Sequence, residues 1–321
     1  MLHVLLLVGA AAAIYFSCEL FVNAVEHLGQ LWRVGTLAIG TVLAAVGTAL
    51  PESVVTGVAV TVGHEHDIGV GAALGGPLAL ATVGYGVIGV ALLLRRRPLP
   101  AIQNRRLARD QAAFLAVFAV KVGLGLVAFA WKPWLGLLFF AGYAAYVVLE
   151  LRAKDEEGDA ELETEALTLT GSETPGIVPV LVQTVGTLAV VFAASQVFVG
   201  QLAWTGEQLG LAPTVIALLL SPIATELPEV MNAIIWVRQG KVQLALANIS
   251  GSMMVQATVP SGLGILFTSW DFDGPLLTSG LVTAAAIVFL LVTLRRGHLN
   301  ARRLAAATGF YVVFAALLPF V

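Results

Sequence analysis

Two short segments place a proline and a carboxylate inside long apolar runs. Residues 47–52 read GTALPE, and residues 224–229 read ATELPE. A charged side chain at membrane depth costs about 2.5–3.5 kcal/mol on insertion scales, and a proline leaves the carbonyl four residues earlier without its helical donor. Neither feature favours a simple spanning helix. Their combination predicts an ion site made of a broken helix, free backbone oxygens and an anionic side chain.

The spacing within each segment directs hydroxyl and carboxylate oxygens to one side of a helix. Thr48 and Glu52 are four residues apart, and Thr225 and Glu229 repeat that relation. Glu226 lies three residues before Glu229 and reaches the same side. Ca²⁺ binds carboxylate, carbonyl and hydroxyl oxygens, so these side chains are candidate cation ligands. The alternative is that each threonine bonds its own backbone and each glutamate has a buried structural partner.

A polar stripe follows later in the chain. Asn248, Ser252 and Gln256 step by four residues and share one helix face. We expect this face to line the ion path opposite the two glutamates. The alternative is hydrogen bonding between helices, which is common for such residues in membranes.

Lys121 is an ionisable residue near the middle of an apolar run. A lysine at that depth is a candidate functional residue, because it can neutralise a site carboxylate when no cation is bound. The alternative, which we favour, is a fixed structural pair with Glu19 or another acid.

The sequence His64-Glu65-His66-Asp67 lies between two apolar runs. It could collect cations near an entrance, but its histidines lack the i, i+4 helical spacing of zinc proteases. We expect a solvated loop.

The composition indicates a membrane protein that crosses the bilayer several times. The chain has 321 residues, of which 58% are hydrophobic and only 12% charged, whereas soluble domains carry about 25% charged residues. The mean hydropathy is +0.91. The single cysteine, Cys18, excludes an internal disulfide. The first apolar run lacks a basic leader and continues into Glu19, so we expect a first spanning helix there and not a cleaved signal.

A span requires about 20 apolar residues, and only helices suit runs of this length. We expect ten spanning helices, at 2–28, 31–63, 67–94, 110–130, 134–153, 177–205, 211–237, 243–268, 274–294 and 301–320. If the N-terminus is outside, the cytoplasmic connections hold all of the 17 basic residues except Lys121 and Lys132. The positive-inside rule therefore predicts that both termini lie outside.

The chain divides into two similar halves. Residues 1–153 form the first five-helix repeat, residues 177–321 form the second, and the acidic stretch 154–176 is expected to be a flexible cytoplasmic linker. An offset of 177 residues superposes Thr48 on Thr225 and Glu52 on Glu229. Five spans per half is an odd number, so the second half enters the membrane from the opposite side. This predicts an inverted repeat with broken helices 2 and 7 and a substrate site at the midplane.

The two segments resemble the paired alpha-repeats of the sodium/calcium exchanger branch of the calcium/cation antiporter superfamily. The family pattern is G-T-S-x-P-E on one helix and G-N-x-x-G-S-N on the next, in both halves. The resemblance implies a transporter that exchanges Ca²⁺ against Na⁺ or H⁺ by alternating access. It also implies the cation ligands Thr48, Glu52, Thr225, Glu229, Asn248 and Ser252, to which the spacing adds Glu226.

The sequence departs from this pattern in the first repeat. Ala49, Ile68 and Ala72 stand where the family has polar residues, and the Gly-Ser-Asn triplet reads Gly75-Gly76-Pro77. Neutral oxygen ligands are lost, whereas Glu226 adds an ionisable one. This exchange of ligand type favours H⁺ over Na⁺ as the counter-ion, because carboxylates crowded in a partly dehydrated cavity hold a proton when no cation is bound.

Other functional classes fit less well. The sequence has no H-E-x-x-H motif and no Ser/Lys or Asp/Asp nucleophile arrangement for an intramembrane enzyme, and no phosphate-binding loop for an ATP-driven pump. A Na⁺/H⁺ exchanger-like transporter and a passive cation channel remain alternatives. We expect no cofactor, no nucleic acid and no obligate protein partner. The expected partners are inorganic cations and the lipid bilayer, in the plasma (cytoplasmic) membrane.

Overall fold

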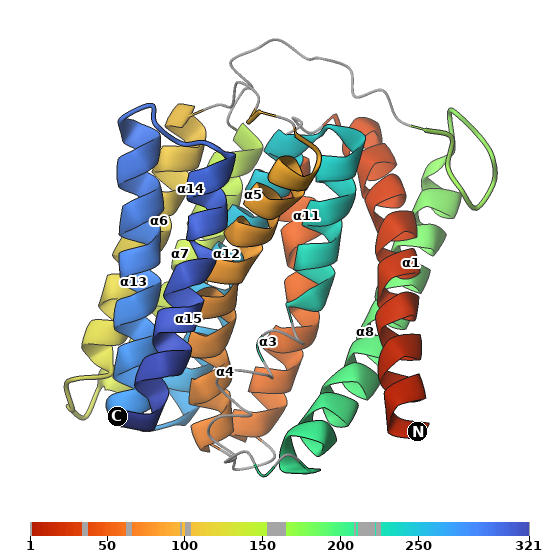
Figure 1. The fold of residues 1–321 in the computed structure, drawn as a ribbon. Helices are drawn as coiled ribbons and strands as arrows, with labels where there is room; N and C mark the ends of the chain where they lie inside the picture. The colour runs from red at the N-terminus through yellow and green to blue at the C-terminus, as the bar shows by residue number, and fades with distance from the viewer. Residues whose placement is uncertain are drawn as a thin grey trace.

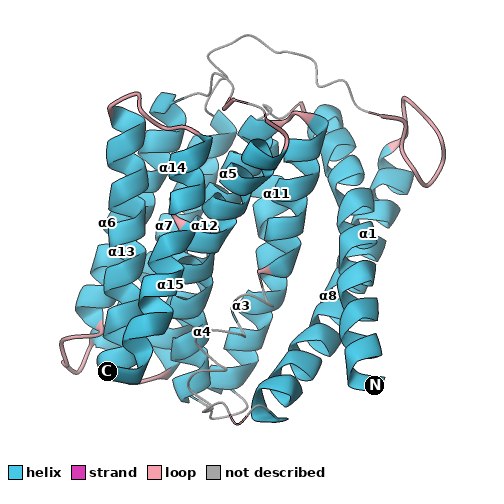
Figure 2. Ribbon diagram, in the orientation of Figure 1, coloured by secondary structure: helices cyan, strands magenta, loops and turns pink. Residues whose placement is uncertain are grey.

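The chain folds as a bundle of helices. The computed structural model describes residues 2–33, 38–61, 66–96, 98–99, 104–152, 165–208, 210, 222 and 226–320. Among these residues no strand occurs beyond an isolated bridge between Leu167 and Ser172, and helices dominate (Figure 2). The all-helical class predicted from composition is therefore confirmed.

The described helices divide between the two halves of the chain. In the first half they are α1 (Leu2–Leu31), the π-helix η1 (Ile39–Ala44), α3 (Ala45–Thr61), α4 (His66–Ala79), the π-helix η2 (Leu80–Gly84), α5 (Tyr85–Leu94), α6 (Asn104–Leu124), the 3₁₀ turn η3 (Lys132–Leu135) and α7 (Gly136–Arg152). In the second half they are α8 (Ile177–Gln208), α11 (Leu227–Gln239), α12 (Val242–Phe267), α13 (Gly274–Arg295), α14 (Ala301–Ala306), α15 (Thr308–Leu317) and the turn η5 (Leu318–Phe320).

The helix α12 occupies the centre of the bundle. It packs against α3, α4, α6, α7 and α11, and most of its side chains are buried. The long helices α1 and α8 lie side by side at one edge, and both chain termini lie at the same end of the bundle (Figure 1). Residues from both halves of the chain therefore meet on the faces of α12.

Six helical segments among the described residues are long and apolar enough to cross a membrane. They are Leu2–Leu31, Val70–Leu94, Lys132–Arg152, Ile177–Phe198, Gly274–Arg295 and Ala301–Phe320. The other four expected spans are not found as helices that are both long enough and apolar enough to cross a membrane. Ile39–Ala49 is a shorter apolar helix, α6 and α12 carry buried polar residues, and the expected span 211–237 lies partly outside the described residues.

The helix break expected at Pro51 is not found there. The bounds of α3 enclose Pro51 within one helix, and the departure from α-helical geometry comes earlier, in η1. A close approach between helices accompanies it, because a β-carbon at Gly251 of α12 would collide with the carbonyl oxygen of Thr41 in η1. A π-helical stretch shifts the hydrogen-bond ladder and is frequent near functional sites.

The second part of the expected linker is docked on the bundle. The backbone nitrogen of Thr168 donates to Oδ1 of Asn23 on α1 at 3.1 Å, and that of Leu169 donates to Oε1 of Gln183 on α8 at 2.8 Å. These side chains satisfy backbone groups that a flexible linker would expose to water. The flexible linker predicted for 154–176 is therefore not observed from Glu165 onward, and residues 154–164 lie outside the described residues.

Candidate cation site

The helix α3 brings Glu52 and Thr48 into the interior of the bundle. Both residues are buried and, one turn apart, share a face as predicted. The Thr48 hydroxyl donates to the backbone oxygen of Ala44 at 3.1 Å, which is the local bond considered as the alternative for each threonine. The same hydroxyl also lies beside the carboxylate of Glu229. Its oxygen lone pairs therefore remain next to the candidate site.

The start of α11 supplies two further carboxylates. Glu226 occupies the N-cap position, Pro228 lies in the first turn and Glu229 follows it. A proline suits the first turn because its missing N–H would have no helical acceptor there, and a helix N-terminus favours nearby negative charge. Glu226 and Glu229 are each only 1% exposed. The predicted ligand Thr225 lies outside the described residues.

Gln256 of α12 connects two of these carboxylates. Its Nε2 donates to Oε2 of Glu52 at 3.0 Å and to Oε2 of Glu226 at 2.6 Å. Because they share this donor, the carboxylates of Glu52 and Glu226 lie close together, and both interact electrostatically with Glu229. The three glutamates therefore form one cluster, with Gln256 as the neutral group between helices.

The rest of the polar stripe on α12 faces the same region. Asn248 donates from Nδ2 to the backbone oxygen of Glu229 at 3.3 Å, and Asn248 and Ser252 are fully buried. Several buried oxygens find no hydrogen-bond partner within the described part of the chain, namely Oε2 of Glu229, Oδ1 of Asn248, Oγ of Ser252 and Oε1 of Gln256. Because most buried polar atoms in folded proteins are bonded, such a group of oxygens fits the donor set of a hard cation.

Carboxylates alone do not make this site. Within the described ranges, no three His, Cys, Asp or Glu residues are arranged so that they could hold a metal ion by themselves. A cation held here would need the neutral oxygens of Thr48, Asn248 and Ser252 together with the glutamates. That mixture resembles the oxygen coordination of calcium more than the nitrogen and sulfur coordination of zinc.

The predicted ligand set did not include two buried polar residues near the glutamates, Gln256 and Asn232. Gln256 was assigned only to the stripe, although it bonds two glutamates. Asn232 is fully buried on α11, and neither atom of its amide has a partner among the residues described. It lies three residues after Glu229, so its helical spacing was the signal that could have identified it.

Gly76 explains why a serine of the family pattern is absent from α4. A β-carbon at Gly76 would lie 2.7 Å from Oε1 of Glu52 and 2.9 Å from Oε1 of Gln256. The glycine therefore allows α4 to approach the carboxylate closely. Pro77 then follows inside the same helix.

The fixed pair expected between Lys121 and an acid is not observed. Lys121 is fully buried, but its Nζ donates to a backbone oxygen of Ala73 and to the hydroxyl of Ser261. In the described ranges Lys121 forms no ion pair with a carboxylate. Glu19, the proposed partner, is exposed and lines a separate hollow with Glu26 and Arg95.

The solvated loop expected at residues 64–67 is described only in part. His64 and Glu65 lie outside the described residues, whereas His66 begins α4.

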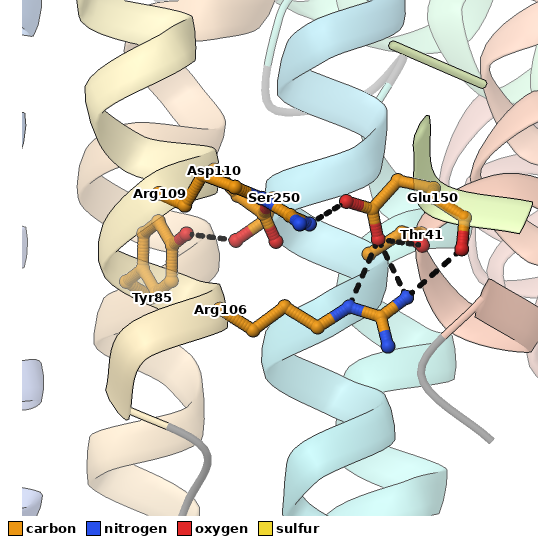
Figure 3. A network of polar contacts seen from close by, with 7 residues as sticks. All are labelled: Thr41, Tyr85, Arg106, Arg109, Asp110, Glu150 and Ser250. Atoms are coloured by element: carbon orange, nitrogen blue, oxygen red, sulfur yellow. Dashed lines mark hydrogen bonds and ion pairs between the residues drawn. The ribbon is translucent and has the colours of Figure 1, made fainter. Parts of the chain in front are cut away.

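A second buried polar cluster lies apart from the glutamates, and Figure 3 shows its residues from close by. Glu150 of α7 accepts from Arg106 of α6 at 2.7 Å, forms an ion pair with Arg109 and accepts from Thr41 of η1 at 3.3 Å. Because its charge is fully paired, this cluster is a structural brace that holds η1 against α6 and α7. It also accounts for the start of α6 at Asn104, ahead of the expected 110, since Glu150 and Asp110 together neutralise the two arginines.

Comparisons with known proteins agree with this architecture. The chain matches the model of the family described as "Sodium/calcium exchanger protein" over residues 2–152 and 179–319. Solved structures of the sodium-calcium exchanger NCX_Mj share the fold. One, soaked with zero Na⁺ and Ca²⁺, has a TM-score of 0.76 at 19% identity, with 99% of each chain covered. Another, soaked with 2.5 mM Na⁺ and 0.1 mM Ca²⁺, has a TM-score of 0.77 at 20% identity, again with 99% of each chain covered.

Relatives in bacteria are similar over nearly the whole length. The inner membrane protein YrbG of Escherichia coli K12 is 26% identical over 98% of this chain and 95% of its own. CaxA of Alkalimonas amylolytica, described as a candidate antiporter, is 27% identical over 97% of this chain and 95% of its own. With its apolar helices, the chain is an integral membrane protein. Since the family model covers most of its length, the chain belongs to the sodium/calcium exchanger protein family, whose members are transporters and not enzymes.

Proposed function

We propose that the chain is a secondary-active antiporter that exchanges Ca²⁺, or a related cation, against H⁺ or Na⁺ by alternating access. The observation that carries this proposal is the cluster of Glu52, Glu226 and Glu229, three buried carboxylates gathered from the two halves of the chain. Buried carboxylates are costly in a membrane and are typical of ion pathways. The family and the description of CaxA support the same activity.

The cation ligands we assign are Thr48, Glu52, Thr225, Glu226, Glu229, Asn248 and Ser252. The assignment is supported by burial of the six that lie in the described residues. Unpartnered oxygens of Glu229, Asn248 and Ser252 support it further, because a bound cation would satisfy them.

The architecture we propose has ten spanning helices arranged as two inverted five-helix repeats. Residues 1–153 and 177–321 would be the repeats and 154–176 the cytoplasmic connection. Support comes from the two segments matched by the family model, 2–152 and 179–319, and from the position of both termini at one end of the bundle (Figure 1). The relation to an inner membrane protein of Escherichia coli favours the plasma (cytoplasmic) membrane.

The proposed exchange is tested by ⁴⁵Ca²⁺ uptake into proteoliposomes that contain the purified chain. Uptake is expected when an outward gradient of H⁺ or Na⁺ is imposed at clamped membrane potential, and no uptake is expected without a counter-ion on the opposite side. A passive channel would instead respond to membrane potential alone. Absence of uptake under every gradient would contradict the proposal.

The topology makes a separate prediction. Single cysteines at Ala160 and near Val321, in a variant that lacks Cys18, should be labelled by a membrane-impermeant reagent from opposite sides. The reason is the positive-inside rule, which places the basic helix ends in the cytoplasm and both termini outside. Labelling of both positions from the same side would exclude an odd number of spans between them.

A further inference from the structure

Lys121 is bound in the interior of the bundle as a metal cation would be. Its side chain is 0% exposed. The Nζ atom donates to the backbone oxygen of Ala73 on α4 at 2.7 Å and to Oγ of Ser261 on α12 at 3.0 Å. It also lies 4.8 Å from the centre of the Phe118 ring, a distance suited to a cation–π interaction. Its close partners are thus a carbonyl, a hydroxyl and an aromatic face, all without formal charge.

Prolines lie next to both acceptors that this ammonium group uses. Pro77 lies four residues after Ala73 inside α4 and has no N–H with which to bond that carbonyl. Pro260 lies four residues after Gln256 in α12 and likewise cannot donate to its carbonyl. The hydroxyl of Ser261 donates to that carbonyl instead, at 3.1 Å. Lys121 therefore binds one backbone oxygen that a proline leaves free, that of Ala73, as ions do in discontinuous membrane helices.

The same two helices reach the Glu52 carboxylate one turn further on. On α4, Ala73 lies three residues before Gly76, which is in close contact with Oε1 of Glu52. On α12, the backbone of Gln256 is bonded to Ser261 and its side chain to Oε2 of Glu52. Lys121 and Glu52 interact electrostatically, although they are not hydrogen-bonded to each other. The ammonium group therefore belongs to the electrostatic environment of the glutamate cluster.

We propose that Lys121 is a tethered cation of the transport site, which replaces a mobile monovalent cation and sets the charge that the transported ion must balance. The inference rests on the proposed function of the three glutamates. Glu52, Glu226 and Glu229 bring three negative formal charges and Lys121 brings one positive, which leaves −2. One divalent cation completes this balance without a second ion. Without Lys121, the loaded site carries an unbalanced negative charge, which is costly to move through the bilayer.

Lys132 is a matched example of a structural lysine. It is also buried, but it is paired with Asp271 at 3.1 Å and donates to the backbone oxygens of Val127 at 2.8 Å and Leu124 at 3.3 Å. These bonds join the connection after α6 to the one before α13. Replacement of Lys132 removes a buried ammonium group from the same part of the chain without touching the glutamate cluster, so it is the control for Lys121.

The test uses ⁴⁵Ca²⁺/Ca²⁺ self-exchange in proteoliposomes, which needs no counter-ion gradient, with N-methylglucamine as the only monovalent cation. Lys121→Ala should lower the exchange rate at least about tenfold, since loss of one partner from a buried charge cluster costs more than the roughly 1.4 kcal/mol that this factor requires. Methylammonium, the free counterpart of the missing group, should restore exchange when added on both sides. Wild-type protein and Lys132→Ala should not respond to methylammonium.

A second variant keeps the test valid if Lys121→Ala does not fold. Lys121→Met retains most of the side-chain volume but removes the charge. It should bind Ca²⁺ at least as tightly as the wild type, measured as protection against thermal unfolding in detergent, because a repelling charge is gone. Its self-exchange should nevertheless be lost, and methylammonium should not restore it because the space is filled.

Three results would overturn the inference. Lys121→Ala could exchange Ca²⁺ at the wild-type rate in N-methylglucamine, or folded Lys121→Ala could lose exchange that methylammonium does not restore. The third is weaker Ca²⁺ binding by Lys121→Met than by the wild type, which is the result expected of a purely structural lysine. Failure of the wild type itself to exchange Ca²⁺ would instead contradict the proposed function, so the two failures are distinguishable.

Discussion

Replacement of Glu229 by glutamine is expected to abolish cation exchange while the protein still inserts into the membrane. Glu229 is almost fully buried at the start of α11, and its Oε2 has no hydrogen-bond partner in the described part of the chain. Glutamine keeps the size of the side chain but removes a negative charge from the cation's surroundings. Loss of one partner of a buried charge pair costs about 3–5 kcal/mol, so uptake should fall at least about a hundredfold. Glu52→Gln should behave in the same way.

The measurement is ⁴⁵Ca²⁺ uptake per folded protein in proteoliposomes. The matched control is Glu150→Gln, which makes the same change at a carboxylate that is equally buried but paired with Arg106 and Arg109. This control should lower the thermal stability of the protein in detergent and retain uptake. Wild-type uptake by both Glu52→Gln and Glu229→Gln would refute the assignment of the central ligands.

The sequence was a good guide to which residues belong to the candidate site, but a poor guide to which side chains each of them contacts. Helical spacing was enough to put Thr48 and Glu52 on one face, because that relation is local. The approach of Glu52 to Glu226 depends on how α3 and α11 pack around α12, and no spacing in the sequence carries that information. Gln256 illustrates this difference. A glutamine in a polar stripe is compatible with any polar neighbour, and only the fold shows that it donates to two glutamates.

Lys121 was the least predictable residue of the site. An intramembrane lysine is expected to find an acid, and the partner we predicted was Glu19 or another acid. The structure pairs it with neutral oxygens instead, and the reason is visible in hindsight in the sequence. Pro77 and Pro260 each deprive a helix carbonyl of its donor, and an ammonium group with three donors can satisfy such oxygens.

The consequences of proline differed between the two segments. At Pro228 a helix begins, as a proline in the first turn favours. At Pro51 the helix α3 continues, and the irregular geometry is found in η1. A proline in a membrane helix is tolerated where neighbouring groups and local π-helical adjustments satisfy the freed backbone. Proline therefore marked the two segments that carry the candidate ligands, but it did not specify where the helix would depart from regular geometry.

Replacement of Glu226 by serine is expected to shift the driving ion from H⁺ toward Na⁺. Glu52 and Glu226 accept from the same amide nitrogen of Gln256, at 3.0 and 2.6 Å. Two buried carboxyl groups held this close favour sharing one proton when no cation is bound, because like charges in a dehydrated site repel each other. Arrival of Ca²⁺ would expel that proton, which is the competition that a cation/H⁺ antiporter requires. Serine removes the second carboxyl group and supplies a neutral oxygen at the position where the family pattern has serine.

The measurement compares ⁴⁵Ca²⁺ uptake driven by a pH gradient with uptake driven by a Na⁺ gradient, both at clamped potential. In Glu226→Ser, uptake driven by the pH gradient should fall at least about tenfold, because loss of a group from a buried charge cluster exceeds the roughly 1.4 kcal/mol that this factor needs. Uptake driven by Na⁺ should persist or rise. Glu226→Asp, which retains a carboxyl group, is the matched control and should keep the pH-driven component. If the wild type is driven by Na⁺ and not by the pH gradient, or if Glu226→Ser keeps full pH-driven uptake, the proton held between Glu52 and Glu226 is not the coupling proton.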